Sequence, residues 1–451
     1  MEYSENLIEL MDNDSTRKEI HITFPDDEEI SEINNERIYQ ESLNIEDNLQ
    51  DEEKLKLGKC NSASITIQVA DLEEDIKEKR MNVDATFINE NTALTEQNIP
   101  FGKYIVKKVE RTADRRWKII TANDYMTLFD IDISEWFNTQ LYPAEETKRS
   151  VIEILDLLCD YVGVVYDKEF VFINGDILVP KNIEPSELVG RDLLEQICEI
   201  NACFGHFDEN GMLRFIQLSQ EEFDYDITTY KSVDYEDYEI NKIDAVKICM
   251  EDGGLGASTD TGIEKNIYTI SANSLLYSFT SEELIVIATK ILNVIKNIIY
   301  TPNDTEIKGG TYIELGKKYQ VNVGNKNIYG YVIKRSITGI QGMFSVLQST
   351  GNEDTYSNDL STEIEVLQGK SAVLKKDIDG LTIQFQDFRS DASARLELNS
   401  DELSVVLNAI YNKNSNLISG SETFVGFKVL RKLSDENSSE LVDQNGDKLA
   451  L

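Results

Sequence analysis

An ordered series of segments between Phe101 and Phe215 constrains the fold of this chain more than any single motif does. Strand-like, helical and turn patterns alternate along it at short spacing, which is typical of α+β domains. In chain order the segments are a strand-like run (102–109), a second run (116–126), a short apolar segment (132–137), a helix (151–162), another strand with a turn (170–175), a further helix (189–200) and a hairpin (204–215).

Length and composition set the number of domains. A chain of 451 residues has room for two to four domains that each bury a core. Apolar residues make up 41% and aromatic residues 9%, which are ordinary globular values. We predict an α+β, mostly β fold in four segments: a β-rich domain (1–133), an α+β domain (134–238), a helix with a small β-barrel (239–350) and a C-terminal coiled-coil or stem extension (351–451).

The charge of the chain is strongly acidic. It contains 44 lysine and arginine residues and 83 aspartate and glutamate residues, which gives a formal net charge of −39. Such a surface repels nucleic acid and anionic lipid and keeps a concentrated protein soluble. Two interpretations stay open. The charge serves solubility alone, or it forms an acidic wall along which DNA slides without binding. In the second case the electrostatic effect that binds basic proteins to DNA would have the opposite sign.

The sequence carries no signal for export or membrane insertion. Its first residues are acidic and lack the layout of a signal peptide. The most apolar stretch, 284–299, contains Lys290 and Lys296 and is shorter than the ~20 residues that cross a bilayer. We therefore predict no membrane span.

The five cysteines are odd in number and lack any C-x-x-C spacing. We expect reduced, buried thiols that act as small hydrophobic side chains, and neither a metal nor a redox site. They are Cys60, Cys159, Cys198, Cys203 and Cys249.

Local patterns predict individual elements in the first two segments. A short strand at 21–24 lies in the charged opening, and a firmer one at 62–69 alternates apolar and polar residues. The helix at 151–162 has an apolar stripe. In the hairpin, Asn210-Gly211 supplies the turn, so Asp208, Glu209 and Asn210 are interpreted as turn residues and not as a metal site.

The third segment begins with a strand at 243–250 and a glycine-rich loop at 253–256. A helix follows, begun by a capping box at Thr280–Glu283. Its predicted apolar face holds Ile287, Ile291, Ile295 and Ile298. Three closely spaced strands, 318–323, 328–334 and 343–347, then favour a small β-barrel.

The fourth segment contains a heptad seam, in which apolar residues recur at alternating steps of three and four. Its candidate oligomer contacts are Ile364, Leu367, Leu374, Ile378, Leu381, Phe385 and Phe388, with Ser371 as one polar core position and Ala392 at the end. Gly369 and Gly380 each weaken a helix by about 1 kcal/mol. We predict a coiled coil at 361–380, followed by either more coiled coil or a β-structured stem.

Catalytic motifs are missing from the sequence. Its two histidines, His21 and His206, each fall in a predicted strand, and no zinc-protease, nucleophile-elbow or P-loop motif occurs. The segment Asp443–Asp447 begins like a calcium loop, but its glycine comes early and no glutamate follows at position 12. We predict no catalytic residue, no cofactor and no metal.

The order of the segments above resembles the tail-tip hub proteins of phages and prophages of Gram-positive bacteria. These tail-associated minor structural proteins are related to the hub of contractile-phage baseplates and include the N-terminal part of the prophage endopeptidase-tail family. The resemblance spans roughly residues 15–350. Related hubs often carry a lytic domain after the barrel. In this chain about 100 residues follow the predicted barrel, which leaves no room for such a domain, so we expect no lytic activity.

The resemblance implies a structural role. Such a hub is a homotrimer of the virion tail, assembled in the bacterial cytoplasm, that joins the tail tube and its distal ring to the tip. It encloses the channel for tape-measure protein and DNA, binds no DNA specifically, and contacts tail fibre or spike proteins. The alternative is a tail protein that binds a host-surface receptor or glycan through residues 351–451.

Overall fold

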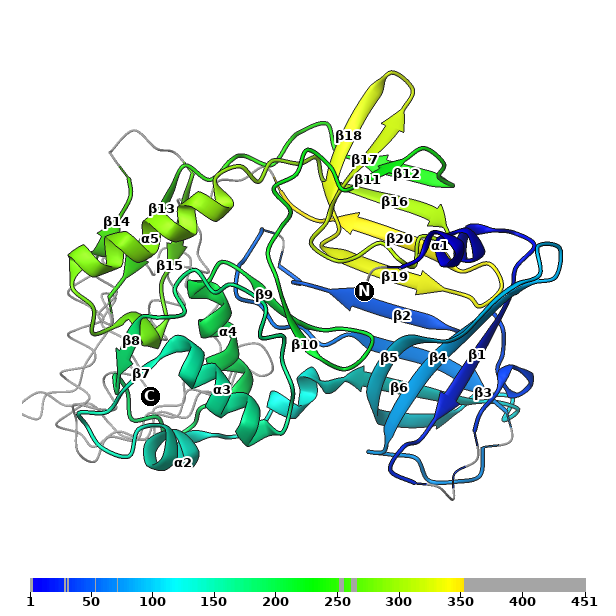
Figure 1. Cartoon of the computed structure of the whole chain (residues 1–451), viewed down its shortest axis with the longest axis horizontal. Coiled ribbons are helices and arrows are strands. Elements are labelled where there is room, and N and C mark those ends of the chain that lie inside the picture. The colour runs from blue at the N-terminus through cyan, green and yellow to red at the C-terminus, as the bar shows by residue number, and fades with distance from the viewer. Residues whose placement is uncertain are drawn as a thin grey trace, which may run out of the picture. The chain divides into compact units, whose positions relative to one another are not determined.

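The fold is given by a computed structural model, which describes residues 3–352 except 28, 29, 31, 53, 71, 251–254 and 261–265. The chain divides into two compact units, Met1–Asp379 and Gly380–Leu451, and every described residue belongs to the first. This part is α+β and mostly β, as the sequence predicts (Figure 1). The predicted coiled coil, stem and calcium-like loop lie outside the described residues.

A curved ten-stranded sheet is the largest element of the fold (Figure 1). Its order is β1-β4-β5-β6-β3-β2-β19-β20-β16-β12. The strands are β1 (Arg17–Thr23), β2 (Asn44–Asn48), β3 (Ser64–Val69), β4 (Arg80–Asn89), β5 (Leu94–Arg111), β6 (Lys118–Asp124), β12 (Ser232–Tyr235), β16 (Asn303–Lys308), β19 (Lys334–Thr338) and β20 (Phe344–Ser349).

The two halves of this sheet come from distant parts of the chain. Six strands precede residue 125 and four follow residue 231, and they meet where β2 pairs antiparallel with β19, Ile45 opposite Ile337. Strands from the predicted first, second and third segments therefore share one sheet. The division of the chain into four domains stays a prediction.

Alternation of side chains fixes which face of the sheet is buried. In β3, Ile65, Ile67 and Val69 are fully buried, as the pattern at 62–69 predicts. In β1, the buried positions are Lys18, Ile20 and Ile22. Lys18 is a charged residue among apolar ones, and its ammonium group donates to the carbonyl oxygen of Met11 at 2.7 Å, at the end of helix α1 (Glu5–Asp12).

The outer edge of β1 is covered by side chains and by a loop. The amide side chain of Gln341 accepts a hydrogen bond from the Lys18 backbone N–H and donates one to the Lys18 carbonyl oxygen. Asn35 accepts from the Ile20 N–H, and Ile33 pairs with Ile22. Because Gln341 lies in the turn between β19 and β20, these bonds fasten the first strand of the sheet to its second half.

The central α+β part forms as predicted, with one exception. Helix α3 (Val151–Val162) begins with a capping box of Ser150 and Glu153 and ends at Gly163, which has a φ of +81°. Helix α4 (Gly190–Ile200) and the hairpin of β9 (Phe204–Phe207) and β10 (Leu213–Ile216) follow. The short elements here are η2 (Tyr125–Phe129), α2 (Ser134–Trp136), η3 (Phe137–Leu141), β7 (Lys148–Ser150) and β8 (Leu178–Pro180).

The strand predicted at 170–175 is wrong, because these residues form turns. Their aromatic side chains make side-chain contacts in place of a backbone ladder. Phe170 and Phe172 lie 5.6 and 4.8 Å from the ring of Phe215, and Asn174 donates to the Ile200 carbonyl oxygen. Packing against β10 therefore fixes this segment without strand pairing.

The remaining elements pack around α5 (Ser281–Ile295), which begins with the predicted capping box of Thr280 and Glu283. Its predicted apolar face, from Ile287 to Ile298, is buried. Helix α5 lies on a small sheet of β13 (Ala245–Cys249), β14 (Leu255–Ser258) and β15 (Ile267–Ile270). The loop predicted at 253–256 is wrong at Gly256, which lies in β14. The other short helices are η1 (Asn35–Arg37) and η4 (Ser274–Leu276).

The strands predicted at 318–323, 328–334 and 343–347 form as β17, β18 and β20, and they divide between two sheets. Strand β19, between β18 and β20, was not predicted, and the small β-barrel of this segment stays a prediction. Strand β17 (Lys318–Val323) pairs with β18 (Lys326–Tyr331) and with β11 (Tyr225–Ile227) in a sheet of their own. Strands β19 and β20 belong to the large sheet.

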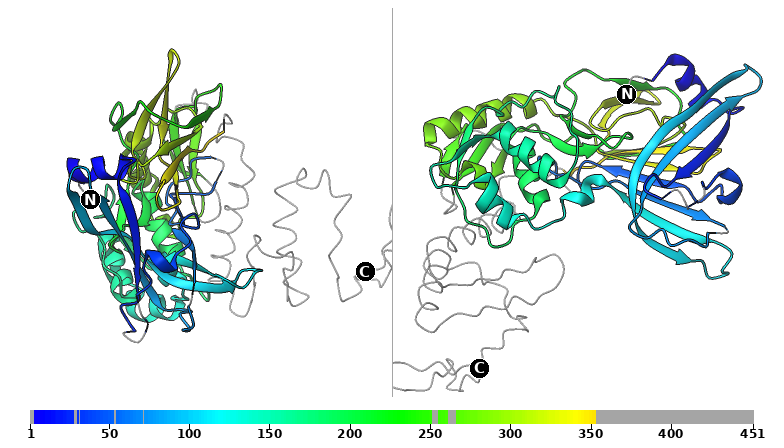
Figure 2. Two further views of the ribbon diagram at one scale, coloured as in Figure 1. Left: turned by 90° about the vertical axis from the view of Figure 1, so that its right-hand side faces the viewer. Right: turned by 60° about the horizontal axis from the view of Figure 1, so that its bottom comes forward.

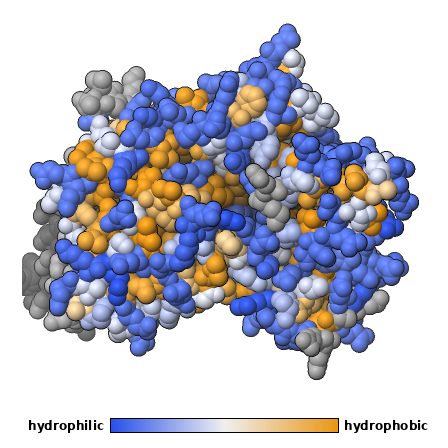
Figure 3. Space-filling view, viewed as in Figure 1, coloured by the Kyte–Doolittle hydropathy of each residue, from blue (hydrophilic) through white to orange (hydrophobic). Residues whose placement is uncertain are grey.

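Polar side chains cover most of the face seen in Figure 3, while apolar ones gather near α5. Val286 on that helix is 56% exposed. No helix among the described residues is long and apolar enough to cross a membrane.

Candidate functional site at the junction of the sheet halves

The predicted oligomer contacts between Ile364 and Phe388 lie outside the described residues and stay a prediction. Within the described part, a cluster of buried charged side chains lies where β2 meets β19. It was not predicted as a site, although a signal for it exists in the sequence. Asp47 shares the alternation parity of Ile45 and Leu49, and Arg335 shares that of Ile333 and Ile337, so both charges lie on a buried face.

A buried ion pair joins the two strands. The Arg335 guanidinium donates to Asp47 Oδ2 at 2.6 Å, and both side chains are less than a tenth exposed. Arg335 also donates to the carbonyl oxygens of Thr311 at 3.1 Å and Ile313 at 2.8 Å. The loop before β17 is thereby tied to both halves of the sheet. Breaking such a pair from one side leaves a charge buried without compensation.

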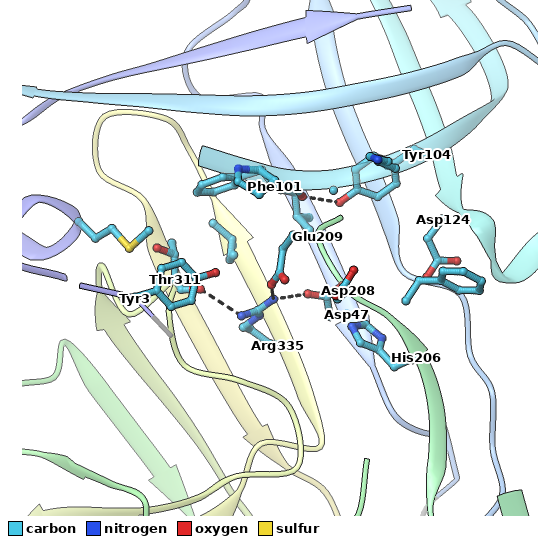
Figure 4. Close-up of a pocket in the computed structure, with 17 residues that line it drawn as sticks. Tyr3, Asp47, Phe101, Tyr104, Asp124, His206, Asp208, Glu209, Thr311 and Arg335 are labelled. Carbon is cyan, nitrogen blue, oxygen red and sulfur yellow. Dashed lines mark hydrogen bonds and ion pairs between the residues drawn. The ribbon is translucent and has the colours of Figure 1, made fainter. Parts of the chain in front are cut away.

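The hairpin of β9 and β10 reaches this ion pair with its turn (Figure 4). Glu209 Oε1 lies 3.9 Å from Arg335. Asp208 builds the turn, because its carboxylate accepts from the N–H groups of Asn210 and Met212. Only Gly211 in the turn has a positive φ, +72°. The interpretation of residues 208–210 as turn residues is thus confirmed, with a contact to Arg335 added.

A cavity of about 30 Å³ lies beside the ion pair, lined by residues that include Tyr3, Tyr104, Asp124 and His206. One or two water molecules fill such a volume, whereas sites for small organic ligands measure roughly 300–1,000 Å³. Asp124 Oδ2, His206 Nδ1, Arg335 Nε and Thr311 Oγ1 are buried here without a protein hydrogen-bond partner. Water satisfies groups of this kind.

Burial changes the acid–base behaviour of the two titratable groups at the cavity. It raises the pKa of Asp124 to about 7, although the Met126 N–H bonds to the carboxylate and opposes this shift. It lowers the pKa of His206, while the carboxylates of Asp47 and Glu209 act in the opposite direction. An acid and a base therefore face a space too small for an organic substrate, which favours a structural role for the cluster.

The cysteines are free and buried, as predicted. Cys60 Sγ lies 3.7 Å from Cys198 Sγ. Burial raises the pKa of each of these two thiols well above the usual range for cysteine. Protonated thiols of this kind are poor nucleophiles and poor metal ligands. Among the described residues, no group of three or more His, Cys, Asp or Glu side chains is placed to hold a metal ion.

The histidines lie in strands, as predicted. His21 is in β1 and His206 in β9. His21 Nδ1 is 2.8 Å from Glu32 at the surface. Among the described residues, no hydrogen bond or ion pair joins His21 to the charged residues at the junction of β2 and β19.

Comparisons with known proteins give structural similarities only. No family model matches the chain, and no curated protein matches its sequence. The structure is similar to the tail protein from Neisseria meningitidis MC58, with 11% identity, a TM-score of 0.44, and coverage of 73% of this chain and 95% of that one. It is also similar to the 43 kDa tail protein of prophage MuSo2 from Shewanella oneidensis (13%, TM-score 0.47, 74% and 98%). A third is the prophage tail protein gp18 from Listeria monocytogenes EGD-e (12%, TM-score 0.43, 79% and 99%). All three are described as tail proteins, two of them from prophages.

Proposed function

We propose that this chain is a structural hub at the tip of a phage or phage-like tail. Three copies surround a channel, join the tail tube and its distal ring to the tip, and let tape-measure protein and DNA pass. The chain acts through its shape and charge and carries out no reaction.

One observation carries this proposal: six of the seven sequence segments that resemble tail-tip hubs form regular elements, and only 170–175 does not. They are β5, β6, α2, α3, α4 and the hairpin of β9 and β10. The fold also brings two groups of strands side by side in one subunit, joined at β2 and β19. Three such subunits present about six similar strand groups, which suits a tube of six-fold symmetry.

The charge of the chain fits the same role. At −39 per chain, a ring of three copies carries −117. A channel with a negative wall repels the phosphates of passing DNA and gives the DNA no site at which to stop. The alternative, receptor or glycan binding through residues 351–451, rests on residues outside the described part and gains no support from the fold.

Light scattering on the purified full chain tests the proposal. We expect a mass near three times 51.3 kDa, at high concentration or with the distal ring protein present. A chain that stays monomeric under both conditions would refute the hub.

Variants of the predicted seam test how the trimer is held together. Leu374→Asn with Ile378→Asn should weaken trimerisation if the seam makes the contact. The matched control, Lys376→Asn with Asp379→Asn, changes the outward f and b positions of the heptad and should leave the mass unchanged. If both variants remain trimeric, the seam does not hold the trimer together, and the hub proposal still stands.

A further inference from the structure

A basic arm stands out against the acidic charge of the whole chain. We define the basic arm as residues 103–118, the end of β5, the turn and the start of β6. Within these 16 residues are seven cationic side chains and only two carboxylates. The cations are Lys103, Lys107, Lys108, Arg111, Arg115, Arg116 and Lys118. A net charge of +5 in one hairpin of a chain of −39 is a local reversal of sign.

The basic arm is built to present these charges. Its turn, residues 112–117, lies at the end of the hairpin of β5 and β6 (Figure 2), and β6 pairs on its other side with β3. Five of the cations of the arm are exposed. The only ion pairs within it are local, Lys108 with Glu110 at 2.8 Å and Arg116 with Asp114 at 3.9 Å. In the described part of the chain, Lys107, Arg111 and Arg115 have no ion pair.

An aromatic pair lies beside the turn of the arm. The rings of Trp117 and Tyr39 are 5.6 Å apart, and Tyr39 is 42% exposed. Tryptophan, tyrosine and arginine are the residues that contribute most to the binding energy of protein interfaces. The arm therefore combines charge with an aromatic anchor, which favours a protein partner.

A second segment has the opposite charge. We define the acidic edge as residues 221–239, which contain β11 and β12. It holds eight carboxylates and one lysine, a net charge of −7. The carboxylates are Glu221, Glu222, Asp224, Asp226, Asp234, Glu236, Asp237 and Glu239. All but Asp224 are exposed. An exposed aromatic ring, Phe223 at 37%, lies among them.

The acidic edge also has an open strand. Strand β12 is the last of the ten strands and pairs only with β16. The basic arm belongs to the third and fourth strands of the same sheet, in its other half (Figure 1). Among the described residues, no ion pair joins the arm to the acidic edge within one chain.

We propose that the basic arm of one copy of this chain binds the acidic edge of the next copy. The two surfaces differ, so the contact is head-to-tail, and repeating it around an axis closes a ring. Complementary charge would steer the copies together and select this register, while the aromatic residues supply buried apolar area. The inference rests on the proposed ring of copies and assigns one of its contacts.

A second copy suits the arm better than nucleic acid does. DNA that approaches the arm meets a chain of net charge −39, whose long-range field repels it. A second copy offers a matching patch of −7, so that the local attraction of the two patches offsets part of the repulsion between two acidic chains.

A charge-swap experiment on the full chain tests this contact. Arg115→Glu with Arg116→Glu reverses charges on the arm, and Glu236→Lys with Asp237→Lys reverses charges on the edge. We expect each pair alone to weaken self-association at least tenfold in sedimentation or light scattering. All four changes in one chain should restore association in part, because the two new glutamates of the arm can then pair with the two new lysines of the edge.

Matched controls separate this contact from general charge effects. Lys77→Glu with Lys296→Glu makes the same net change at exposed positions outside both segments and should leave self-association unchanged. Lys107→Glu with Arg111→Glu is a second arm variant for the case that the first does not fold.

Each remaining outcome decides the proposal. It is overturned if the arm variants behave like the control, if the fourfold change fails to restore association, or if the arm variants lose DNA binding while the edge variants change nothing. A wild-type trimer that is insensitive to all these changes overturns the contact but leaves the hub. A wild-type chain that never trimerises overturns the hub itself.

Discussion

At the scale of single residues, the stability of the junction between the two sheet halves depends on buried charges that compensate one another. Arg335 and Asp47 lie on strands whose other inward residues are apolar, so each charge depends on the other for compensation. Asp124 lies in the same region with one oxygen lacking a protein partner. These residues make the junction specific and also sensitive to substitution and pH.

We expect Arg335→Met to lower the free energy of unfolding by about 3–5 kcal/mol, because Asp47 is then buried as an unpaired carboxylate. Urea unfolding measures this change. Lys334→Met on the same strand is the control. Its ion pair with Asp51, at 3.3 Å, lies at the surface, and its loss should cost less than about 1 kcal/mol. Equal effects of the two variants would contradict the role of the buried pair.

Asp124 predicts a dependence of stability on pH. Burial raises its pKa from 3.8 to about 7 in the folded chain. Its contribution to stability is therefore full below about pH 4 and is lost as the pH rises through about 7. Asp124→Asn cannot ionise, so its free energy of unfolding relative to the wild type should rise between pH 4 and 8, on the order of a few kcal/mol.

For His206→Gln we expect the opposite dependence of relative stability on pH. Burial lowers the pKa of His206, so the histidine costs stability as the pH falls through its lowered value. Replacing it should improve relative stability toward acid and change little above neutral pH. Urea unfolding of both variants across pH 4–8 distinguishes the two groups. Curves that run parallel to the wild type would show that neither group titrates on unfolding as inferred.

At the scale of elements, β1 shows how an outer strand avoids pairing with other chains. Lys18 points inward, and burial lowers its pKa to about 8. Gln341, Asn35 and Ile33 occupy the backbone groups on the outer side of the strand. Inward charges and covered edges are devices that natural sheets use against edge-to-edge association.

Gln341→Leu should expose this edge. The Lys18 N–H and carbonyl groups would lose their partners, at a cost of about 1–3 kcal/mol in the free energy of unfolding. Light scattering should also show aggregation that grows with concentration. Gln348→Leu is the control, because its side chain donates to the exposed carboxylate of Asp304 at 3.1 Å and to no other described residue. Comparable aggregation of the control would rule out the edge as the cause.

Elements were predictable from the sequence where local chemistry decides them. Ser150 and Gly163 bound α3, and Thr280 begins α5, because caps satisfy groups within the same turn. The segment 170–175 was wrongly predicted as a strand, because its conformation depends on contacts of Phe170 and Phe172 with Phe215. The pairing of Asp47 with Arg335 was equally hidden. Parity places each charge on a buried face, but nothing local joins positions 288 residues apart.

At the scale of the whole molecule, charge predicts the lining of the assembled channel. If the proposed ring forms, its inner wall should be net negative and poor in lysine and arginine, since inward cations would bind phosphate and delay DNA. A structure of the assembled trimer with the wall residues counted by sign tests this. A neutral or basic wall, with carboxylates only outside, would refute the acidic channel and leave the hub standing.

The pairing of β2 with β19 also has a consequence for how the chain is made. Asn48 and Lys334 are neighbours in the sheet but about 290 residues apart in the chain. At about 5–20 residues per second, the ribosome needs roughly 15–60 s to supply the missing strand. During that time β2 leaves the first half of the sheet with an open edge. Synthesis speed and protection of that edge on the ribosome thus decide how much of the chain reaches its fold before it meets another nascent copy.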